Sequence, residues 1–260
     1  MKRKRISINI EEFPVHLQRF LCCADIYDSS CSSEARVYFI DKDAGYYLKI
    51  AKSGELSREA EMTEYFHSLG LGVGVILYIS RERDYLLTER ASGEDMTDND
   101  YLGDPIRLAR TMGRLLRELH EKSIEKCPIV RTPEYLDTVW ENYEKGIFDP
   151  TLFGDKQSFA TADEAFAFVK EHAHLLRADV LIHGDYCLPN IVLDGWKFSK
   201  FIDVGNGGIG DRHIDLFWGA WTLNYNLGTD EYRDVFFDAY GRELIDFTLL
   251  RVIEAAECFG

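Results

Sequence analysis

Two short stretches decide the fold expected of this chain: His183-Gly184-Asp185-Tyr186-Cys187-Leu188-Pro189-Asn190 and Phe201-Ile202-Asp203-Val204-Gly205. Asp185 and Asn190 are five positions apart, and Asp203 follows Asp185 by 18 positions at the end of an apolar run. Carboxylate and amide oxygens are hard ligands of the kind that Mg2+ prefers, and a carboxylate can accept the proton of a hydroxyl group. The two stretches therefore predict a site that handles a divalent cation and a proton.

The spacing H-x-D-x-x-x-x-N, followed by a strand that ends in Asp, is typical of phosphoryl-transfer sites of the kinase type. Asp185 is accordingly predicted to be the catalytic base, and Asn190 and Asp203 are predicted to bind Mg2+. The Asp185–Asn190 segment alone could equally be a turn rich in Asp and Asn. His183 before it and the Asp203 strand after it favour the functional interpretation. His183 itself is expected to form structural hydrogen bonds rather than to transfer a proton.

A lysine on a strand and a glutamate on the next helix form a second predicted feature. Lys49 ends the run Tyr46-Tyr47-Leu48-Lys49, and its ammonium group would place a point charge on nucleotide phosphates. Glu59, near the start of the following helical segment, is the carboxylate that would hold it. Either residue alone would be interpreted as a solvated surface charge, but their order ahead of the His183 loop favours a nucleotide site.

The loop Ser29–Glu34 lies where kinases carry a glycine-rich loop over the phosphates, yet it contains no glycine. Its serine hydroxyls and backbone N–H groups could still bind phosphate oxygens. The missing glycines leave open a protein that binds nucleotide without catalysing a reaction. The sequence contains neither a G-x-x-x-x-G-K-[ST] loop nor a G-x-S-x-G elbow, which argues against a P-loop nucleotidase and an ordinary serine hydrolase.

The hydrophobic periodicity changes along the chain from strand-like to helical. The sequence predicts an α+β fold in which residues 1–92 form a small antiparallel-sheet lobe that binds nucleotide and residues 93–260 form a larger, mainly helical catalytic and substrate-binding lobe. Strands are predicted at 35–40, 45–50, 73–80, 84–88, 180–182, 191–193 and 198–202. Helices are predicted at 53–69, 106–119, 133–145, 161–176, 211–227, 229–240 and 244–258.

The composition limits which cellular compartment and which classes of binding partner we expect for the protein. The 260 residues include 46% hydrophobic residues, enough for a sizeable core, and carry a net charge of −15. Such acidity argues against nucleic-acid binding, and it suits either a solvated surface or a polycationic ligand. Six cysteines without a C-x-x-C pair suggest neither zinc nor a redox dithiol. With no signal-like or membrane-spanning stretch, we expect a cytoplasmic monomer or weak dimer that does not bind membranes.

Taken together, these motifs resemble the aminoglycoside phosphotransferases, and within them the 3'-phosphotransferase branch. The resemblance covers nearly the whole chain and includes the acidic, aromatic end Glu257-Cys258-Phe259. It implies a bilobal, protein-kinase-like fold, with Mg2+ as cofactor and ATP (or GTP) as phosphoryl donor. It also implies phosphorylation of an aminoglycoside antibiotic, at the 3'-hydroxyl, and hence antibiotic resistance. The matching stretches are Tyr46–Lys49, Arg58-Glu59, His183–Ile191, Phe198–Gly205 and Asp211–Asp215.

The resemblance also assigns individual roles. Tyr47 would stack on the adenine, the backbone of Glu89-Arg90-Ala91 would pair with its edge, and Ser33 would touch phosphate. With Lys49 and Glu59, the implied nucleotide-binding residues are Ser33, Tyr47, Lys49, Glu59, Glu89 and Ala91. For the cationic substrate, the acidic candidates are Asp155, Glu254 and Glu257, each of which could equally be a solvated surface charge.

Aromatic residues mark a second possibility for the substrate. Trp221 and Tyr225 stand where the family carries polar, substrate-facing residues, and Asn206 replaces an Arg. Flat aromatic surfaces suit less charged ligands, so the alternative is a related small-molecule kinase for a macrolide, nucleoside or sugar. The same aromatic residues could also be core packing.

Overall fold

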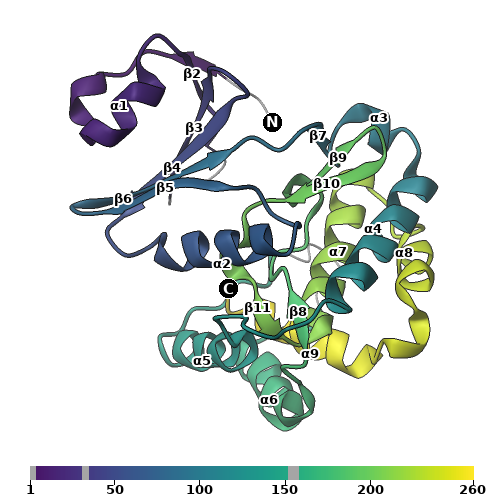
Figure 1. The fold of residues 1–260 in the computed structure, drawn as a ribbon. Coiled ribbons are helices and arrows are strands. Elements are labelled where there is room, and N and C mark those ends of the chain that lie inside the picture. The colour runs from purple at the N-terminus through teal and green to yellow at the C-terminus, as the bar shows by residue number, and fades with distance from the viewer. Residues whose placement is uncertain (1–3, 31–34, 152–157) are drawn as a thin grey trace. The chain divides into compact units, whose positions relative to one another are not determined.

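The computed structural model describes residues 4–30, 35–151 and 158–260, and the chain divides into two compact units (Figure 1). Unit 1 comprises Met1–Glu94 and Ile191–Gly205, and unit 2 comprises Asp95–Asn190 and Asn206–Gly260. Unit 1 is built on an antiparallel sheet and unit 2 is mainly helical. The expected α+β class is confirmed.

The sheet of unit 1 has six antiparallel strands in the order β1-β2-β3-β4-β6-β5. Four of them, β3 to β6, lie within a few residues of the predicted strands. In the central pair, Lys49 of β4 lies opposite Leu86 of β6. The strands are β1 (Lys4–Ile6), β2 (Asp25–Asp28), β3 (Arg36–Asp41), β4 (Tyr46–Lys52), β5 (Val75–Ser80) and β6 (Arg83–Glu89).

Two helices cover opposite faces of this sheet, as Figure 1 shows: α1 (Val15–Leu21) and α2 (Ser57–Ser68). Successive side chains of a strand point to opposite faces. Leu48 of β4 accordingly packs in the cluster that contains Leu17 of α1, while Ala51 packs with Ala60 of α2. Lys49 shares the face of Ala51, and it therefore points toward α2. Helix α1, which follows the short 3-10 helix η1 (Ile10–Glu12), was not expected from the sequence.

A hairpin from late in the sequence belongs to unit 1. Its strands β9 (Ile191–Asp194) and β10 (Lys197–Phe201) pair antiparallel. The Phe201 backbone N–H donates to the Leu71 carbonyl at 2.8 Å, and Lys200 Nζ donates to the Gly70 carbonyl at 3.0 Å. The division expected between residues 92 and 93 places this hairpin with the helical part, whereas these bonds group it with unit 1. The short strand β7 (Glu94–Asp95) spans the first unit boundary, and the 3-10 helix η5 (Val204–Asn206) spans the last.

In the part of unit 2 that the structure describes, helices combine with a small two-stranded sheet, in which β8 and β11 are antiparallel. Its longer helices correspond to predicted ones, with boundaries shifted by a few residues. One of the larger shifts is at the start of α8, where Thr229 Oγ1 accepts from the Glu231 N–H in a turn before the helix begins. The elements are α3 (Asn99–Leu102), α4 (Pro105–His120), α5 (Arg131–Glu144), α6 (Ala162–His172), η3 (Ala173–Leu175), β8 (Val180–Ile182), η4 (Leu188–Asn190), β11 (Gly208–Gly210), α7 (Arg212–Leu227), α8 (Arg233–Tyr240), η6 (Arg242–Leu244) and α9 (Phe247–Glu257).

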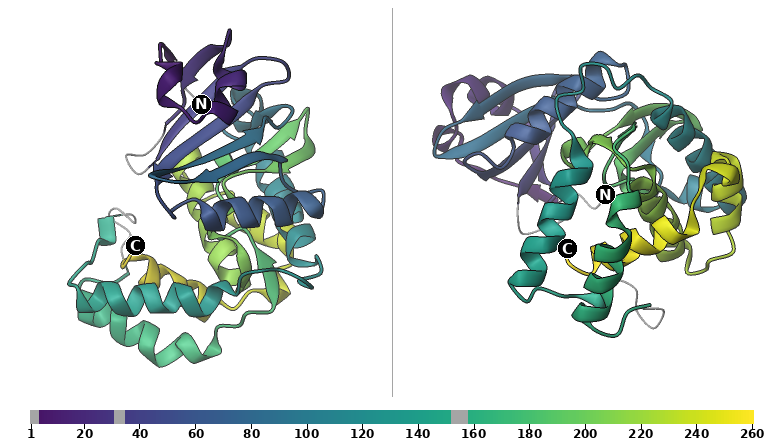
Figure 2. Two further views of the ribbon diagram at one scale, coloured as in Figure 1. Left: turned by 60° about the vertical axis from the view of Figure 1, so that its left-hand side comes forward. Right: turned by 90° about the horizontal axis from the view of Figure 1, so that it is seen from below.

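Two contacts organise the helices of unit 2. Helices α5, α6 and α9 lie side by side (Figure 2) around a core that includes Val139, Val169, Ile253 and Phe259. Helix α4 packs so closely on α8 that only a glycine fits at one position. A Cβ atom on Gly113 would lie 2.3 Å from the Phe236 carbonyl oxygen. The backbones of the two helices therefore approach directly at this position.

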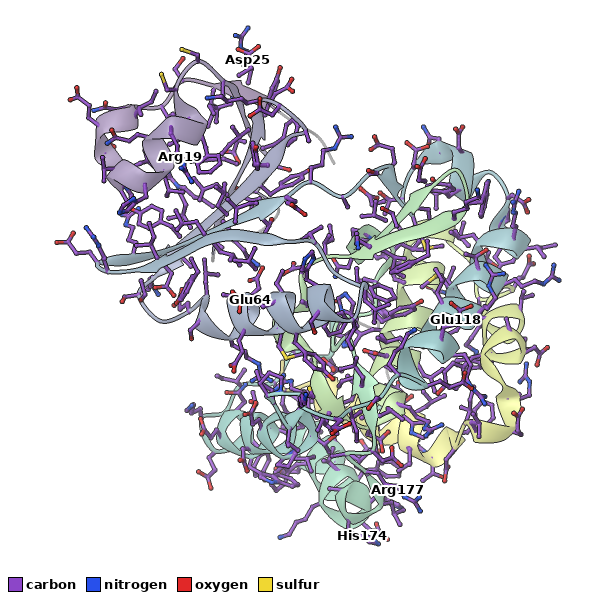
Figure 3. All side chains as sticks on the ribbon, in the orientation of Figure 1. Arg19, Asp25, Glu64, Glu118, His174 and Arg177 are labelled. Carbon is purple, nitrogen blue, oxygen red and sulfur yellow. The ribbon has the colours of Figure 1, made fainter. Side chains whose placement is uncertain are left out.

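Much of the acidic charge lies on solvated helix faces. Glu64 on α2 and Glu118 on α4, both labelled in Figure 3, are exposed. No helix among the described residues is both long and apolar enough to span a bilayer. Surface charge of this kind accounts for part of the net charge without a ligand.

We predict that Gly113→Ala destabilises the protein. The added methyl group would collide with backbone atoms of α8, and overpacking of this kind costs about 1–3 kcal/mol. Helix propensity acts in the opposite direction, because Ala favours a helix by about 1 kcal/mol over Gly. The measurement is the midpoint of urea unfolding.

Arg110→Ala is the matched control, since Arg110 is exposed on the same helix. The control is expected to unfold like the wild type. A higher midpoint for Gly113→Ala would contradict the close approach of α4 and α8.

Candidate active site

The ammonium group of Lys49 lies between two carboxylates of unit 1. Lys49 Nζ is 2.6 Å from Glu59 Oε2 and 2.9 Å from Asp203 Oδ1. These contacts join β4, α2 and the end of the β9–β10 hairpin. The predicted pairing of Lys49 with Glu59 is thus present, because the sheet alternation directs Lys49 toward the helix that carries Glu59. The contact of Lys49 with Asp203 was not predicted.

Burial and charge oppose each other in this cluster. The Lys49 side chain is 23% exposed and that of Glu59 is 14% exposed. Burial disfavours the charged lysine, but the carboxylates of Asp203 and Glu59 outweigh it and raise the pKa of Lys49. Burial also raises the pKa of Glu59, against the opposing effect of Lys49. The lysine is therefore a fixed positive charge, suited to hold phosphate oxygens.

Asp203 is held in a backbone conformation that few residues adopt. Its φ is 57°, in the left-handed region, which costs an L-residue other than glycine about 1–2 kcal/mol. Gly205 lies against the same cluster, because a Cβ atom there would be 3.2 Å from Glu59 Cβ. The Asp203 side chain remains 51% exposed. A strained, accessible carboxylate is typical of a functional position.

Two of the other predicted nucleotide residues, Tyr47 and Glu89, lie on the same sheet. Tyr47 on β4 packs its ring 5.3 Å from that of Phe39. Glu89 ends β6, where its side chain accepts a hydrogen bond from the Gly74 N–H at 3.2 Å, and Ala91 follows after the sheet. Ser33 lies outside the described residues. The adenine and phosphate roles of these residues remain predictions.

In unit 2, the loop that carries Asp185 is closed by its own asparagine. Asn190 Nδ2 donates to the Asp185 carboxylate at 2.9 Å and to the Asp185 backbone carbonyl at 3.0 Å. Gly184 has a φ of 80°, and a Cβ atom there would lie 1.9 Å from the Asn206 carbonyl oxygen. His183 is fully buried, and its Nδ1 accepts the Asp185 N–H at 3.4 Å. The structural role expected for His183 agrees with this position.

A buried carboxylate on α7 holds the start of this loop. Asp215 is fully buried, and its carboxylate accepts the N–H groups of His183 and Gly184, each at 2.7 Å. His120 of α4 lies 3.2 Å from Asp215 Oδ2 through Nε2, and 2.8 Å from the Tyr240 hydroxyl through Nδ1. Burial lowers the pKa of His120, so the neutral ring donates from Nε2 and accepts from Tyr240.

Sequence reasoning missed the role of this network. The segment Asp211–Asp215 was among the stretches that resemble the family, but the sequence analysis assigned none of its residues a role. His120 lies inside an amphipathic helix with no motif around it. The pairing joins residues 95 positions apart, and such contacts leave no local pattern in a single sequence.

Two of the predicted residues fit a divalent cation chemically. The side-chain nitrogen of Asn190 is used within the loop, so its carbonyl oxygen is the atom suited to face a ligand. Asp203 uses one oxygen on Lys49 and is half exposed. Among the described residues, no three His, Cys, Asp or Glu side chains converge as a complete metal site. Mg2+ often relies on one or two protein ligands together with substrate phosphates, and each of these two oxygen donors, taken within its own unit, is of the type that this mode uses.

The predicted substrate carboxylates have different surroundings. Glu257 Oε1 accepts hydrogen bonds from the Tyr135 hydroxyl at 2.9 Å and from Trp218 Nε1 at 3.2 Å. Burial raises the pKa of Glu257 to about 7. Glu254 is one turn earlier on α9 and is partly exposed. Asp155 lies outside the described residues, and all three substrate roles remain predictions.

Within each unit, the arrangement offers specific chemistry. Unit 1 supplies a paired ammonium group and an accessible carboxylate, and unit 2 supplies a carboxylate oriented by an amide. A positive charge on phosphates and a base for a hydroxyl are the protein's main contributions to phosphoryl transfer. That Asp185, Asn190 and Asp203 act in one site remains a prediction from their spacing in the sequence.

Comparisons with known proteins agree with this chemistry. The profile of the phosphotransferase enzyme family matches residues 30–253. A probable aminoglycoside 3'-phosphotransferase of Lactococcus lactis is 52% identical over 260 residues, 99% of this chain and 98% of that protein. An aminoglycoside 3'-phosphotransferase of Niallia circulans is 30% identical over 206 residues, 77% of this chain and 78% of that protein.

Solved structures show the same fold. The crystal structure of an aminoglycoside-3'-phosphotransferase of type VIII has a TM-score of 0.72 at 20% identity, covering 99% of this chain and 94% of that chain. The structure of a Streptomyces rimosus aminoglycoside phosphotransferase in complex with ADP and streptomycin has a TM-score of 0.70 at 21% identity. The match covers 86% of this chain and 90% of that chain. The protein-kinase-like fold expected from the sequence is confirmed.

We predict that Asp215→Asn weakens both the fold and the His183–Asn190 loop. An amide offers one oxygen and two N–H groups, so at least one buried donor of the loop or of His120 would face another donor. Leaving a buried polar group unpaired costs about 1–3 kcal/mol. The measurements are urea unfolding and hydrogen exchange of the His183 and Gly184 amides.

Asp246→Asn is the control, because Asp246 caps α9 by accepting the Thr248 N–H and Asn caps helices equally well. Unchanged exchange at His183 and Gly184 in the Asp215 variant would contradict the anchoring role.

We predict that stability falls as the pH rises from about 4.5 to about 7 because of Glu257. Its carboxyl ionises at about 4.5 in the unfolded chain and at about 7 in the folded protein. Between these values the unfolded chain loses a proton that the folded protein keeps, which favours unfolding by up to about 3 kcal/mol. Urea unfolding of the wild type and Glu257→Gln across this range measures the difference. Identical pH dependence in both proteins would assign the effect to other groups.

Proposed function

Because the chain belongs to the phosphotransferase enzyme family, we propose that it transfers the γ-phosphoryl group of ATP to the 3'-hydroxyl of an aminoglycoside antibiotic, and so confers resistance. The observation that carries the phosphoryl-transfer part is the contact of Lys49 with both Glu59 and Asp203. The acceptor is supported by the relatives from Lactococcus lactis and Niallia circulans, which are named as aminoglycoside 3'-phosphotransferases.

The donor nucleotide would be bound by unit 1. Lys49 would hold phosphate oxygens of the donor, with Glu59 fixing its position. The ring of Tyr47 would stack on the base, while Glu89 and Ala91 would align its edge and Ser33 would touch phosphate. The paired lysine stabilises the negative charge that spreads over the phosphoryl oxygens during transfer. ATP and GTP are both compatible with these contacts.

The acceptor hydroxyl would be activated by Asp185. Asn190 holds the Asp185 carboxylate through Oδ2, which leaves Oδ1 to accept the hydroxyl proton. As the acceptor oxygen bonds to phosphorus, the bond from phosphorus to the bridging oxygen of the donor breaks. The hydroxyl proton passes to Asp185, and the nucleoside diphosphate leaves. The side chain orients the hydroxyl before it takes the proton.

The residues that would hold Mg2+ are Asn190, through its carbonyl oxygen, and Asp203. When bound, the cation would neutralise charge on the donor phosphates. The protein's own part is to keep these oxygen atoms available, which Asn190 does by directing its side-chain nitrogen into the loop.

The acceptor side would use acidic residues. An aminoglycoside carries several ammonium groups, and the net charge of −15 favours its approach. Asp155, Glu254 and Glu257 are the proposed contacts. Burial raises the pKa of Glu257 to about 7, and a bound ammonium group would favour its charged form. We place this activity in the cytoplasm, in a monomer or weak dimer that binds neither nucleic acid nor membranes.

One observation favours a second candidate, a kinase for a less charged hydroxyl compound such as a macrolide, nucleoside or sugar. Trp221 and Tyr225 stack on α7, and Tyr225 is 71% exposed. Exposed aromatic surface suits uncharged ligands as well as cationic ones. Calorimetry with macrolides, nucleosides and neutral sugars tests this candidate, and binding by aminoglycosides alone would exclude it.

We predict ADP release when the protein is incubated with ATP, Mg2+ and kanamycin or neomycin. Asp185→Ala is expected to lower kcat by about 10²–10⁴-fold, because proton transfer in the transition state contributes that much, while its affinity for ATP stays within a few-fold of the wild type. Coupled ADP detection measures the rate, and calorimetry measures ATP binding.

Asp246→Asn serves again as a variant outside the proposed site. Absence of turnover across a broad aminoglycoside panel would contradict the acceptor class. Full turnover by Asp185→Ala would contradict the role of its carboxylate.

A further inference from the structure

Two adjacent cysteines bring their thiols together at the end of α1, and we call them the Cys22–Cys23 pair. The two Sγ atoms are 3.5 Å apart, and both side chains are exposed. The pair lies between Arg19 and Asp25, which are labelled in Figure 3. Because α1 and α2 cover opposite faces of the sheet (Figure 1) and Lys49 points toward α2, the pair is remote from the Lys49 cluster.

The backbone holds both cysteines at the centre of a tight turn. The Ala24 N–H donates to the Leu21 carbonyl at 3.3 Å. Cys22 has φ −63° and ψ 126°, and Cys23 has φ 62°. This bond and these angles describe a type II turn, whose second central position favours glycine or asparagine because its φ is positive. A cysteine at that position is strained, and strain that is kept at one residue points to a role for its side chain.

A lysine from the turn between β3 and β4 fixes this arrangement. Lys42 Nζ donates to the Arg19 carbonyl at 2.7 Å and to the Cys22 carbonyl at 2.9 Å. The Cys22 N–H donates to the Gln18 carbonyl at 2.8 Å. The turn is thus held from two sides. The two sulfur atoms are therefore already together before a ligand arrives, which lowers the entropy cost of binding it.

The pair is better suited to remain a dithiol than to form a disulfide. Consecutive Cα atoms are about 3.8 Å apart, whereas the Cα atoms of a disulfide are usually about 4.4–6.8 Å apart. A hydrogen bond with Cys23 raises the pKa of Cys22 and so favours its protonated form. Because the thiolate is the form that attacks electrophiles and disulfides, Cys22 is a weak nucleophile at neutral pH.

The separation of the sulfur atoms selects among the soft ions that thiolates bind. With bonds of about 2.3 Å, as thiolates form to zinc, sulfur atoms at the observed distance subtend an angle of about 99° at the ion. Zn2+ prefers four ligands, and within the described part of the chain no three His, Cys, Asp or Glu side chains converge. Mercury(II) with two thiolates is linear, which would place the sulfur atoms about 4.6 Å apart at that bond length.

Trivalent arsenic that carries one organic group meets both conditions. It takes two further ligands rather than four, and it is pyramidal, with bond angles close to the angle that the pair offers. Arsenic in this state is soft and prefers sulfur to oxygen ligands. The distance between the thiols and the number of thiols therefore both favour an arsenical over zinc or mercury.

We propose that the Cys22–Cys23 pair is a chelating site for monosubstituted trivalent arsenicals. With phenylarsine oxide, one bond forms from arsenic to each sulfur atom, and the bonds from arsenic to oxygen break. The oxygen leaves as water with the protons of the two thiols. Arsenic stays trivalent, so the step needs neither an oxidant nor a reductant. The site goes beyond the proposed kinase activity, which uses neither thiol.

The test is the uptake of phenylarsine oxide by the reduced, folded protein, measured by intact mass after a wash with 2-mercaptoethanol. We expect one phenylarsine group per chain in the wild type, and we expect the dithiol 2,3-dimercaptopropanol to remove it. Cys22→Ser and Cys23→Ser each leave a single thiol. Since a second, intramolecular bond strengthens binding by about 10²–10⁴-fold, half-saturation in either variant is expected to need at least about a hundredfold more reagent.

Cys31→Ser and Cys127→Ser are the matched controls, because each removes another thiol and keeps the pair. Both are expected to bind like the wild type. Cys23→Gly repeats the test in a chain that is expected to fold well, since glycine suits the positive φ. Thermal unfolding checks the fold of every variant. Wild-type affinity in a variant that lacks Cys22 or Cys23, lost binding in either control, or no retained adduct in the wild type would overturn the site.

Discussion

The contact of the Lys49 ammonium group with two carboxylates is the constraint on which unit 1 depends. It brings together a strand, a helix and the end of a hairpin. Two of its residues, Lys49 and Asp203, are 154 positions apart in the sequence. A largely buried charge that loses its partner costs several kcal/mol. The sheet alternation that points Lys49 toward α2, the burial of Glu59 and the left-handed backbone of Asp203 all serve the same contact.

A second buried charge plays the corresponding part in unit 2. Asp215 has no solvent exposure, and its oxygens are shared among two backbone N–H groups and the His120 ring. These bonds fix the loop in which Asn190 orients Asp185. Each unit thus uses a charge removed from water to hold a more accessible carboxylate, Asp203 in one and Asp185 in the other.

Local patterns explain what the sequence could predict. The strand-like pattern located β3 to β6, and the fixed spacing of the H-x-D-x-x-x-x-N loop singled out Asp185 and Asn190, which the structure joins by a hydrogen bond. The pairing of Lys49 with Glu59 followed from order along the chain. What was missed depends on distant partners: the His120–Asp215 pair, the grouping of the β9–β10 hairpin with unit 1, and the seven-residue helix α1. Long-range packing selects these features, and one sequence does not record it.

The glycine before Asp185 has a consequence for how such an enzyme can change over generations. At Gly184 even a methyl group would overlap the Asn206 carbonyl oxygen, whose distance from the added carbon would be 1.9 Å. Substitution of the residue next to Asp185, the proposed catalytic base, is therefore strongly disfavoured. The outer surface of α7 carries no such restriction, since Tyr225 projects into solvent. Inherited variation is therefore expected to accumulate on the outer surface of that helix and to spare Gly184 in the loop that precedes Asp185.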